Sequence, residues 1–234
     1  SLNQTHDGKL LIGTINKLNV LDSDKIYQIP IHSYNTVTYI KDIEVNKKTV
    51  FICGSGLGRQ YKNNEAGYEK AYDFTINEYS YRGISYKSFI GSCIKLINDS
   101  IILAGMWNEF VPVFKVKDNL LINNGRIKYD YDSIRSIRTD VIFQDKNNNY
   151  WIGTTRGLFL VNEKMERQEI PDNNLLKEGI NEILDDNKGN LWISSKRGLI
   201  LYNFTQNEFK YFPFGIEDKF LSDIAVEPNN TKMW

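Results

Sequence analysis

The sequence has few of the residues on which most catalytic and metal sites depend. Its 234 residues include two cysteines and two histidines, His6 and His32. That is too few for a histidine-rich zinc site, and no paired-cysteine, metalloprotease, Walker-loop or Gly-x-Ser-x-Gly motif occurs. We therefore expect no metal, no cofactor and no enzymatic activity in this chain.

An excess of one charge and long apolar runs are missing as well. The 29 Lys and Arg residues balance 29 Asp and Glu residues, with no dense basic run. Proteins bind nucleic acid largely by neutralising its phosphates, so we expect no nucleic-acid contact by this segment. Apolar runs such as residues 101–104 are far shorter than the ~20 residues that cross a bilayer, and the first residues do not resemble a signal peptide. Membrane contact is expected only through segments outside this chain.

Two features that resemble reactive or ligand-binding sites, the cysteines and a glycine-rich segment, are expected to be structural. Cys53 and Cys93 lie in apolar, strand-like segments and are predicted to be buried free thiols. Residues 54–58, Gly-Ser-Gly-Leu-Gly, lack the following helix and the Lys-Ser/Thr of a phosphate loop, so they predict a turn. Buried thiols suit a reducing cytoplasm but also occur in periplasmic proteins, so the cysteines leave the compartment open.

The most informative feature is an internal repeat. Residues 150–158, YWIGTTRGL, recur as residues 191–199, LWISSKRGL. Weaker copies come earlier in the chain. We take one position of the repeat as its marker, and this position is Gly13, Gly54, Gly105, Gly153 and Ser194 in the five copies. Apolar residues alternate between turns, and no helical apolar period persists. Four-stranded repeats of about 40 to 50 residues are typical of β-propeller blades.

The fifth copy shows the four strands most clearly, at residues 180–184, 191–194, 199–203 and 208–212. We predict an all-β fold, a β-propeller of four-stranded antiparallel blades. Its repeats are phased as residues 2–42, 43–93, 94–141, 142–182 and 183–223, and residues 224–234 begin a sixth. Because a closed propeller leaves no unpaired edge, we expect the chain to be a fragment of a single larger propeller of about seven blades. The alternative is a five-bladed ring that residues 224–234 close beside the first blade.

The repeat resembles a known family. The pattern Asp-x-x-Gly-x-Leu-Trp-Ile-Gly-Thr-x-x-Gly-Leu, carried best by residues 145–158 and 186–199, is similar to the two-component regulator propeller repeat. Asp145 and Asp186 are predicted to form turns. The residues expected to build the blades, with both tryptophans packed between blades, are Trp151, Gly153, Gly157, Trp192 and Gly198. The sialidase Asp-box, Ser-x-Asp-x-Gly-x-Thr-Trp, has a different spacing, so we expect no sialidase.

The resemblance implies a function. It implies a non-enzymatic sensor domain of a Bacteroidetes-type hybrid two-component protein, on the periplasmic side of the inner membrane. It also implies that a membrane-spanning helix and a histidine kinase lie outside this chain, and that the full-length protein forms a homodimer.

A ligand site is predicted at the end of the blades where the turn after the second strand and the loop after the fourth strand emerge together. Aromatic rings stack on sugars and arginine forks bind carboxylates, so we expect a neutral or acidic oligosaccharide as ligand. The candidate residues are Trp107, Asn108, Tyr81, Arg82, Tyr131, Arg135, Arg138, Arg156 and Arg197. The alternative is that these aromatic and basic residues only cover loops or pair with neighbouring aspartates.

Two other functions stay open. A rigid propeller face can serve as a scaffold for protein partners, because a fold alone does not fix a function. A propeller lyase or hydrolase is less favoured, because it would need a histidine or glutamate base in the channel. His6 and His32 lie in different sequence contexts, so no acid–base pair can be assembled from them.

Overall fold

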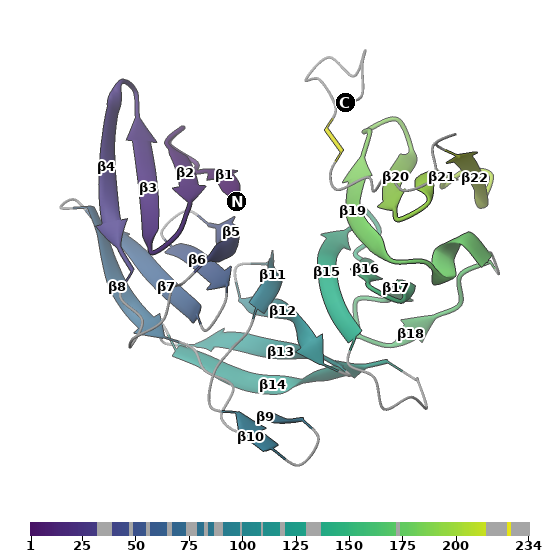
Figure 1. The fold of residues 1–234 in the computed structure, drawn as a ribbon, viewed down its shortest axis with the longest axis horizontal. Helices are drawn as coiled ribbons and strands as arrows, with labels where there is room; N and C mark the ends of the chain where they lie inside the picture. Colours follow the sequence, from purple (N-terminus) through teal and green to yellow (C-terminus); the bar gives the residue numbers. More distant parts are fainter. Residues whose placement is uncertain are drawn as a thin grey trace. The chain divides into compact units, whose positions relative to one another are not determined.

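The computed structural model describes residues 1–31, 39–46, 49–54, 57–64, 67–73, 79–81, 84–86, 91–98, 100–108, 110–117, 120–129, 137–171, 174–213 and 224–225. The chain divides into two compact units, Ser1–Ser136 and Ile137–Trp234. Both are built from antiparallel strands joined by short turns (Figure 1). Each unit is treated below by itself.

The first unit holds three sheets whose strands pair in sequence order. Sheet 1 comprises β1 (Leu2–Gln4), β2 (Leu10–Gly13), β3 (Lys17–Asp22) and β4 (Lys25–Pro30). Sheet 2 comprises β5 (Ile40–Val45), β6 (Thr49–Gly54), β7 (Leu57–Asn64) and β8 (Gly67–Asp73). Sheet 3 comprises β11 (Gly91–Ile97), β12 (Ile101–Asn108), β13 (Phe110–Lys117) and β14 (Leu120–Lys128). A hairpin of β9 (Tyr79–Tyr81) and β10 (Ile84–Tyr86) lies between sheets 2 and 3 in the sequence.

The second unit holds two more such sheets. Sheet 4 comprises β15 (Ile137–Gln144), β16 (Tyr150–Thr154), β17 (Gly157–Val161) and β18 (Arg167–Gln168). A short 3-10 helix, η1 (Asn174–Lys177), leads to sheet 5, which comprises β19 (Ile180–Asp185), β20 (Asn190–Ser195), β21 (Gly198–Asn203) and β22 (Glu208–Pro213). These four strands agree with the four expected from the fifth copy. The predicted all-β propeller architecture is confirmed.

Within the first unit, each sheet packs on the next through apolar side chains. Leu11, Leu18 and Val20 of sheet 1 cluster with residues of sheet 2, and Phe51 and Cys53 of sheet 2 cluster with residues of sheet 3. We call the face that a sheet turns to the following sheet its front face, and the opposite one its back face. The strand alternation makes this possible, because successive side chains point to opposite faces.

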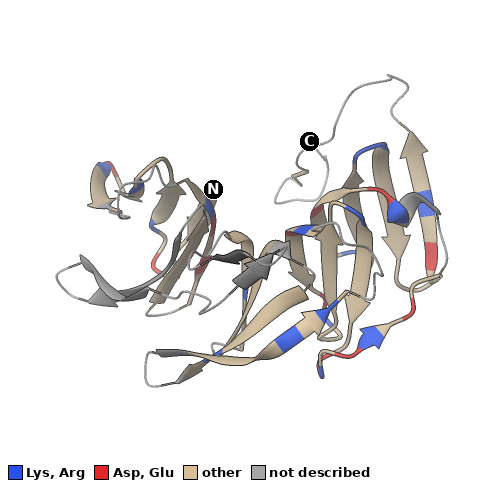
Figure 2. Cartoon of the chain, turned by 60° about the horizontal axis from the view of Figure 1, so that its bottom comes forward, with Lys and Arg blue, Asp and Glu red and all other residues tan. Residues whose placement is uncertain are grey.

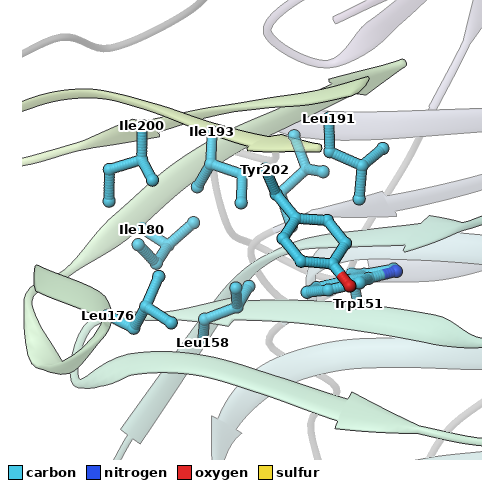
Figure 3. Packing of buried hydrophobic residues seen from close by; sticks show 9 residues of the cluster. Trp151, Leu158, Leu176, Ile180, Leu191, Ile193, Ile200 and Tyr202 are labelled. Carbon is cyan, nitrogen blue, oxygen red and sulfur yellow. The ribbon is translucent and has the colours of Figure 1, made fainter. Parts of the chain in front are cut away.

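The second unit repeats the same packing. Trp151 and Leu158 on the front face of sheet 4 meet Leu191, Ile193 and Tyr202 on the back face of sheet 5 (Figure 3). The Trp151 and Tyr202 rings are 5.0 Å apart between centroids. Burial of an apolar side chain of this size contributes about 1.5–3 kcal/mol, so these clusters are the main source of stability between blades.

The first strand of sheets 2 to 5 carries a β-bulge at one recurring place. The register to the second strand shifts between Ile40 and Asp42, and in the same way in the other three sheets. The extra residues are Lys41, Ser92, Asp140 and Asn181. A bulge bends a strand and redirects a side chain, and it is common beside functional sites. The repeat therefore includes a conformational feature as well as a hydrophobic pattern.

The strand pairing of sheet 2 moves the repeat marker predicted at Gly54 by one residue. Cys53 pairs with Asp42 just as Gly153 pairs with Val141, so Cys53 rather than Gly54 is the counterpart of Gly153. The reason is that the turn after β5 is shorter: its closing hydrogen bond joins residues 46 and 49, whereas the turn after β15 is closed between residues 145 and 149. The repeat boundaries drawn at residues 42, 93, 141 and 182 fall inside β5, β11, β15 and β19.

Both cysteines are buried free thiols, as predicted. Among the described residues, no helix is both long enough and apolar enough to cross a membrane.

Candidate functional site

The turn between the second and third strands is held by a hydroxyl group in both sheets of the second unit. Thr154 Oγ1 donates a hydrogen bond to the Gly157 carbonyl (2.9 Å) and accepts one from the Arg156 backbone N–H (3.1 Å). Ser195 Oγ makes the same two bonds, to Gly198 (2.9 Å) and from Arg197 (3.3 Å). Serine and threonine stabilise turns in this way. Arg156 and Arg197 therefore leave the backbone from equivalent turn positions.

The bulged ends of the first strands lie at the same end of the sheets as these turns. Thr139 pairs with Thr154, and Ile180 pairs with Ser195, immediately before each bulge. The backbone N–H of Thr155 also donates to the Arg138 carbonyl (2.9 Å). The structure thus groups six charged residues, which we call the turn end of the second unit: Arg138, Asp140, Arg156, Glu178, Lys196 and Arg197.

Two arginines of the turn end are paired with carboxylates. The Arg138 guanidinium contacts Asp140 through both Nε and Nη2, the latter 3.1 Å from Oδ2. Arg197 Nη2 lies 3.1 Å from Glu178 Oε1. These pairs agree with the alternative that the arginines neutralise nearby acids. Lys/Arg and Asp/Glu segments likewise alternate in the second unit in Figure 2.

The turn end still carries an excess of positive charge, with four cations facing two carboxylates. Arg197 is largely exposed, since 69% of its side chain is accessible, so its ion pair is weak in water. Arg138 is half-buried, and the two-point contact with Asp140 fixes the orientation of its guanidinium. A guanidinium group held in this way can donate hydrogen bonds to an anionic or hydroxyl-rich ligand, and it loses less conformational entropy on binding than a mobile arginine side chain would.

The structure describes only some of the residues predicted to bind the ligand. Arg82, Tyr131 and Arg135 lie outside the described residues. Tyr81 is in β9, and Trp107 and Asn108 are in β12, where the backbone alone is described. Arg138, Arg156 and Arg197 belong to the turn end.

Sequence reasoning missed three members of the turn end, Asp140, Glu178 and Lys196. Asp140 follows Arg138 by two residues in the sequence. That spacing fits a regular strand and gives no reason to expect the β-bulge at Asp140. Glu178 and Lys196 were visible only as loop and turn charges. His6, considered as a base, is exposed in the turn between β1 and β2, and His32 lies outside the described residues.

The blade-building residues occupy tight positions. The Trp151 side chain is 2% exposed. A Cβ on Gly153 would lie 2.6 Å from Val141 Cγ1 and 2.7 Å from Ile180 Cγ2. Gly157 has a φ of 124° and faces the Leu176 carbonyl, which would lie 2.3 Å from an added Cβ. Gly198 similarly faces the Phe212 carbonyl, and Trp192 lies against the Phe212 ring at 5.8 Å.

The aspartate of the repeat caps the turn between the first and second strands. Asp145 accepts hydrogen bonds from the backbone of Asn147 and Asn149, from the Asn149 amide and from Trp151 Nε1 (2.9 Å). Asp186 makes the same set, ending on Trp192 Nε1 (3.3 Å). Burial raises the pKa of Asp186, but hydrogen bonds from Asn190, Lys188 and Trp192 outweigh burial and hold that pKa below its usual value. The hydrogen bonds of both carboxylates close the turn, as the sequence predicts.

A second group of charged residues lies where sheets 2 and 3 meet. Asp42 accepts hydrogen bonds from the backbone N–H groups of Ile43 and Ile94, both at 2.8 Å. Burial raises the pKa of Asp42 to about 6. Glu44 pairs with Lys95 at 3.1 Å, and burial raises its pKa as well. These bonds join β5 to β11, so the group fastens two blades. Among the described residues, no cluster of metal-ligating side chains occurs.

Comparisons with known proteins find one family match over a short segment and several solved structures of similar fold. Residues 133–156 match the sequence family described as Two component regulator propeller. The chain is similar to the extracellular domain of the putative hybrid two component system from B. thetaiotaomicron, with a TM-score of 0.71 and 15% identity over 98% of this chain and 29% of that one. No functionally curated protein matches the chain in sequence.

Two other solved structures share the fold. One is a protein of unknown function from Bacteroides caccae, with a TM-score of 0.62 and 11% identity over 94% of this chain and 80% of that one. The other is in the Mitotic Checkpoint Complex, with a TM-score of 0.71 and 9% identity over 99% of this chain and 69% of that one. At such identities the likeness is one of fold.

The matched residues 133–156 include the bulged strand β15, the Asp145 turn and the buried Trp151, which are the parts that build a blade. Residues 133–156 are thus similar to the two component regulator propeller repeat, the family that the sequence pattern of the chain resembles.

Proposed function

We propose that this chain is a ligand-binding sensor propeller of a two-component signalling protein, acting on the periplasmic side of the inner membrane. The family match over residues 133–156 carries the proposal. The likeness in fold to the extracellular domain of a putative hybrid two component system supports it. In this proposal the chain itself catalyses no reaction, and a histidine kinase elsewhere in a homodimeric protein reads its state.

The ligand would bind at the turn end of the second unit. Four cations and two carboxylates belong to it, and Arg156, Lys196 and Arg197 lie on turns that are held by Thr154 and Ser195. Such a surface suits a neutral or acidic oligosaccharide, since guanidinium groups bind both hydroxyl and carboxylate oxygens. Ligand binding would then favour one of two signalling arrangements by its difference in affinity for them.

Titration calorimetry with a panel of neutral and acidic oligosaccharides tests the proposal. We expect at least one acidic member to bind, and Arg138→Ala and Arg156→Ala to weaken binding about tenfold or more, the loss that follows from one charge-assisted hydrogen bond. Lys164→Ala, at an exposed turn on the opposite end of sheet 4, is the matched control and should leave affinity unchanged. Equal affinity in all three variants would rule out the turn end as the site.

A further inference from the structure

One ion pair of the turn end joins two different segments of the second unit. Arg197 Nη2 lies 3.1 Å from Glu178 Oε1. Arg197 belongs to the turn between β20 and β21, whereas Glu178 belongs to the loop between η1 and β19. The other pair, Arg138 and Asp140, lies within one strand, β15. A ligand therefore meets a carboxylate fixed in a strand at one arginine and a carboxylate on a loop at the other.

The backbone of Arg197 is held from two sides. Its N–H donates a hydrogen bond to Ser195 Oγ at 3.3 Å, and its carbonyl accepts one from Tyr211 Oη at 2.6 Å. A Cβ added to Gly198 would lie 2.9 Å from Tyr211 Cε2, so the tyrosine ring lies close against the turn. A change of partner at Arg197 therefore needs a new side-chain rotamer and no movement of the turn.

The loop that carries Glu178 is held in a similar way. Leu176 before it and Ile180 after it are buried in the core between sheets 4 and 5 (Figure 3). The N–H of Lys196 donates a hydrogen bond to the Gly179 carbonyl at 2.9 Å, which ties the loop to the turn of sheet 5. The Glu178 carboxylate is therefore positioned against the guanidinium group by the fold itself.

The contact between the two side chains is weak and readily exchanged. One nitrogen of Arg197 lies within ion-pair distance of one oxygen of Glu178, and water reaches both side chains. Ion pairs of this kind contribute little to stability. A ligand carboxylate that accepts hydrogen bonds through both of its oxygens makes a stronger contact with a guanidinium group than a one-point pair does. The exchange therefore favours a ligand that carries a carboxylate.

We propose that Glu178 competes with the ligand for Arg197 and thereby makes the turn end select acidic over neutral oligosaccharides. This inference rests on the proposed function, for which it names the ligand class. A neutral sugar offers hydroxyl groups, which are weaker acceptors for a guanidinium group than a carboxylate and do not displace Glu178. A uronic acid replaces one ion pair by another and releases Glu178 to water. The aliphatic chain of Lys196 lies against Gly179 and keeps a second cation beside the released carboxylate.

Asp140 supplies the comparison, because its two-point contact holds Arg138 in one orientation. Glu178→Gln and Asp140→Asn each remove one negative charge from the turn end. A long-range effect of charge would therefore raise the affinity for an acidic ligand in both variants. The proposal instead predicts changes in opposite directions, since Glu178→Gln removes a competitor and Asp140→Asn removes a support.

Titration calorimetry with two probes tests the proposal, a trimer of galacturonic acid and the corresponding neutral trimer of galactose. We expect the wild type to bind the acidic trimer at least about tenfold more tightly than the neutral trimer. Glu178→Gln should bind the acidic trimer about two- to fivefold more tightly than the wild type does, the gain that corresponds to the loss of one exposed ion pair. Asp140→Asn should bind the acidic trimer more weakly than the wild type does.

Arg197→Ala completes the test as a double-mutant cycle. In that background Glu178→Gln should leave the affinity for the acidic trimer unchanged, because the group for which Glu178 competes is gone. Thermal unfolding checks that every variant is folded. An affinity that Glu178→Gln leaves unchanged or lowers, or that both charge variants raise equally, would overturn the inference and leave the proposed site standing. Binding of neither trimer by the wild type or by Glu178→Gln would overturn the inference and the proposed site together.

Discussion

Single residues in this protein do mostly structural work, and the aspartates show it most clearly. Asp145 and Asp186 each accept four hydrogen bonds that close a turn and fix a tryptophan. Asp42 instead joins two blades by accepting backbone N–H groups from both. Aspartate therefore has two structural roles in this protein. The pKa of Asp186 is lowered, whereas the pKa of Asp42 is raised.

Asp186→Ala should destabilise the second unit by about 1–3 kcal/mol near neutral pH, because it leaves Trp192 Nε1 and two backbone donors without their acceptor. The native pKa is lowered, so the stabilisation is present above the ordinary aspartate pKa and is lost as the pH falls through the native value. Urea unfolding at several pH values measures it, with the exposed Glu208→Ala as control. A loss of stability that stays constant down to low pH would contradict this account.

Asp42→Asn should remove a pH dependence from the first unit. The native pKa of about 6 exceeds the ordinary 3.8, so the folded state binds a proton more tightly and stability falls as the pH rises between these values. The shift corresponds to about 3 kcal/mol. The charges of Glu44 and Lys95 also act on this carboxyl group, so the wild type and the variant are compared by the slopes of their stability against pH. Parallel pH profiles in urea unfolding would show that Asp42 is not the source.

At the scale of elements, the same position is filled differently in neighbouring sheets. Gly153 in β16 faces Val141 and Ile180 closely, whereas its counterpart Ser194 in β20 is buried with its hydroxyl unpaired in the described part of the structure. Equivalent places in the second strand therefore differ in side-chain size and polarity. The bulges, in contrast, occur in all of sheets 2 to 5. The first strand of these sheets therefore keeps one backbone geometry while its side chains differ.

Gly153→Ala and Ser194→Ala should therefore have opposite effects. The first places a Cβ 2.6 Å from Val141 Cγ1 and should cost about 1–3 kcal/mol through overpacking. The second removes a buried unsatisfied hydroxyl and should leave stability unchanged or raise it by up to about 1 kcal/mol. Thermal and urea unfolding of the two variants check the contrast. Equal losses of stability in the two variants would contradict the predicted contrast.

At the scale of the molecule, the proposed ligand site belongs to the second of the two compact units. A saturating ligand should stabilise the unit that holds its site, by about 2.7 kcal/mol at a hundredfold excess over Kd. Hydrogen exchange should therefore slow in β15–β22 on adding a binding oligosaccharide. Slowing confined to β1–β14 would assign the ligand to the first unit instead.

Much of the fold could be predicted because its causes are local. The alternation of residues 180–184 and the turn residues 185–189 act along a few neighbouring residues, so the strands of sheet 5 were placed closely. The aspartate turns and the buried thiols follow from the same local chemistry. The marker at Gly54 was misplaced by one residue because a shorter turn changes the register without changing the pattern.

The candidate site was less predictable than the fold. Arg138, Arg156 and Arg197 could be selected from the repeat, but their ion pairs with Asp140 and Glu178 could not, because a strand bulge and an inter-blade loop bring them together. The sequence alone determined the strand period, the turn chemistry and the family pattern, since these depend on neighbours along the chain. The tertiary structure decided the bulges and the ion pairs, because these depend on the register between strands and on which loops approach them.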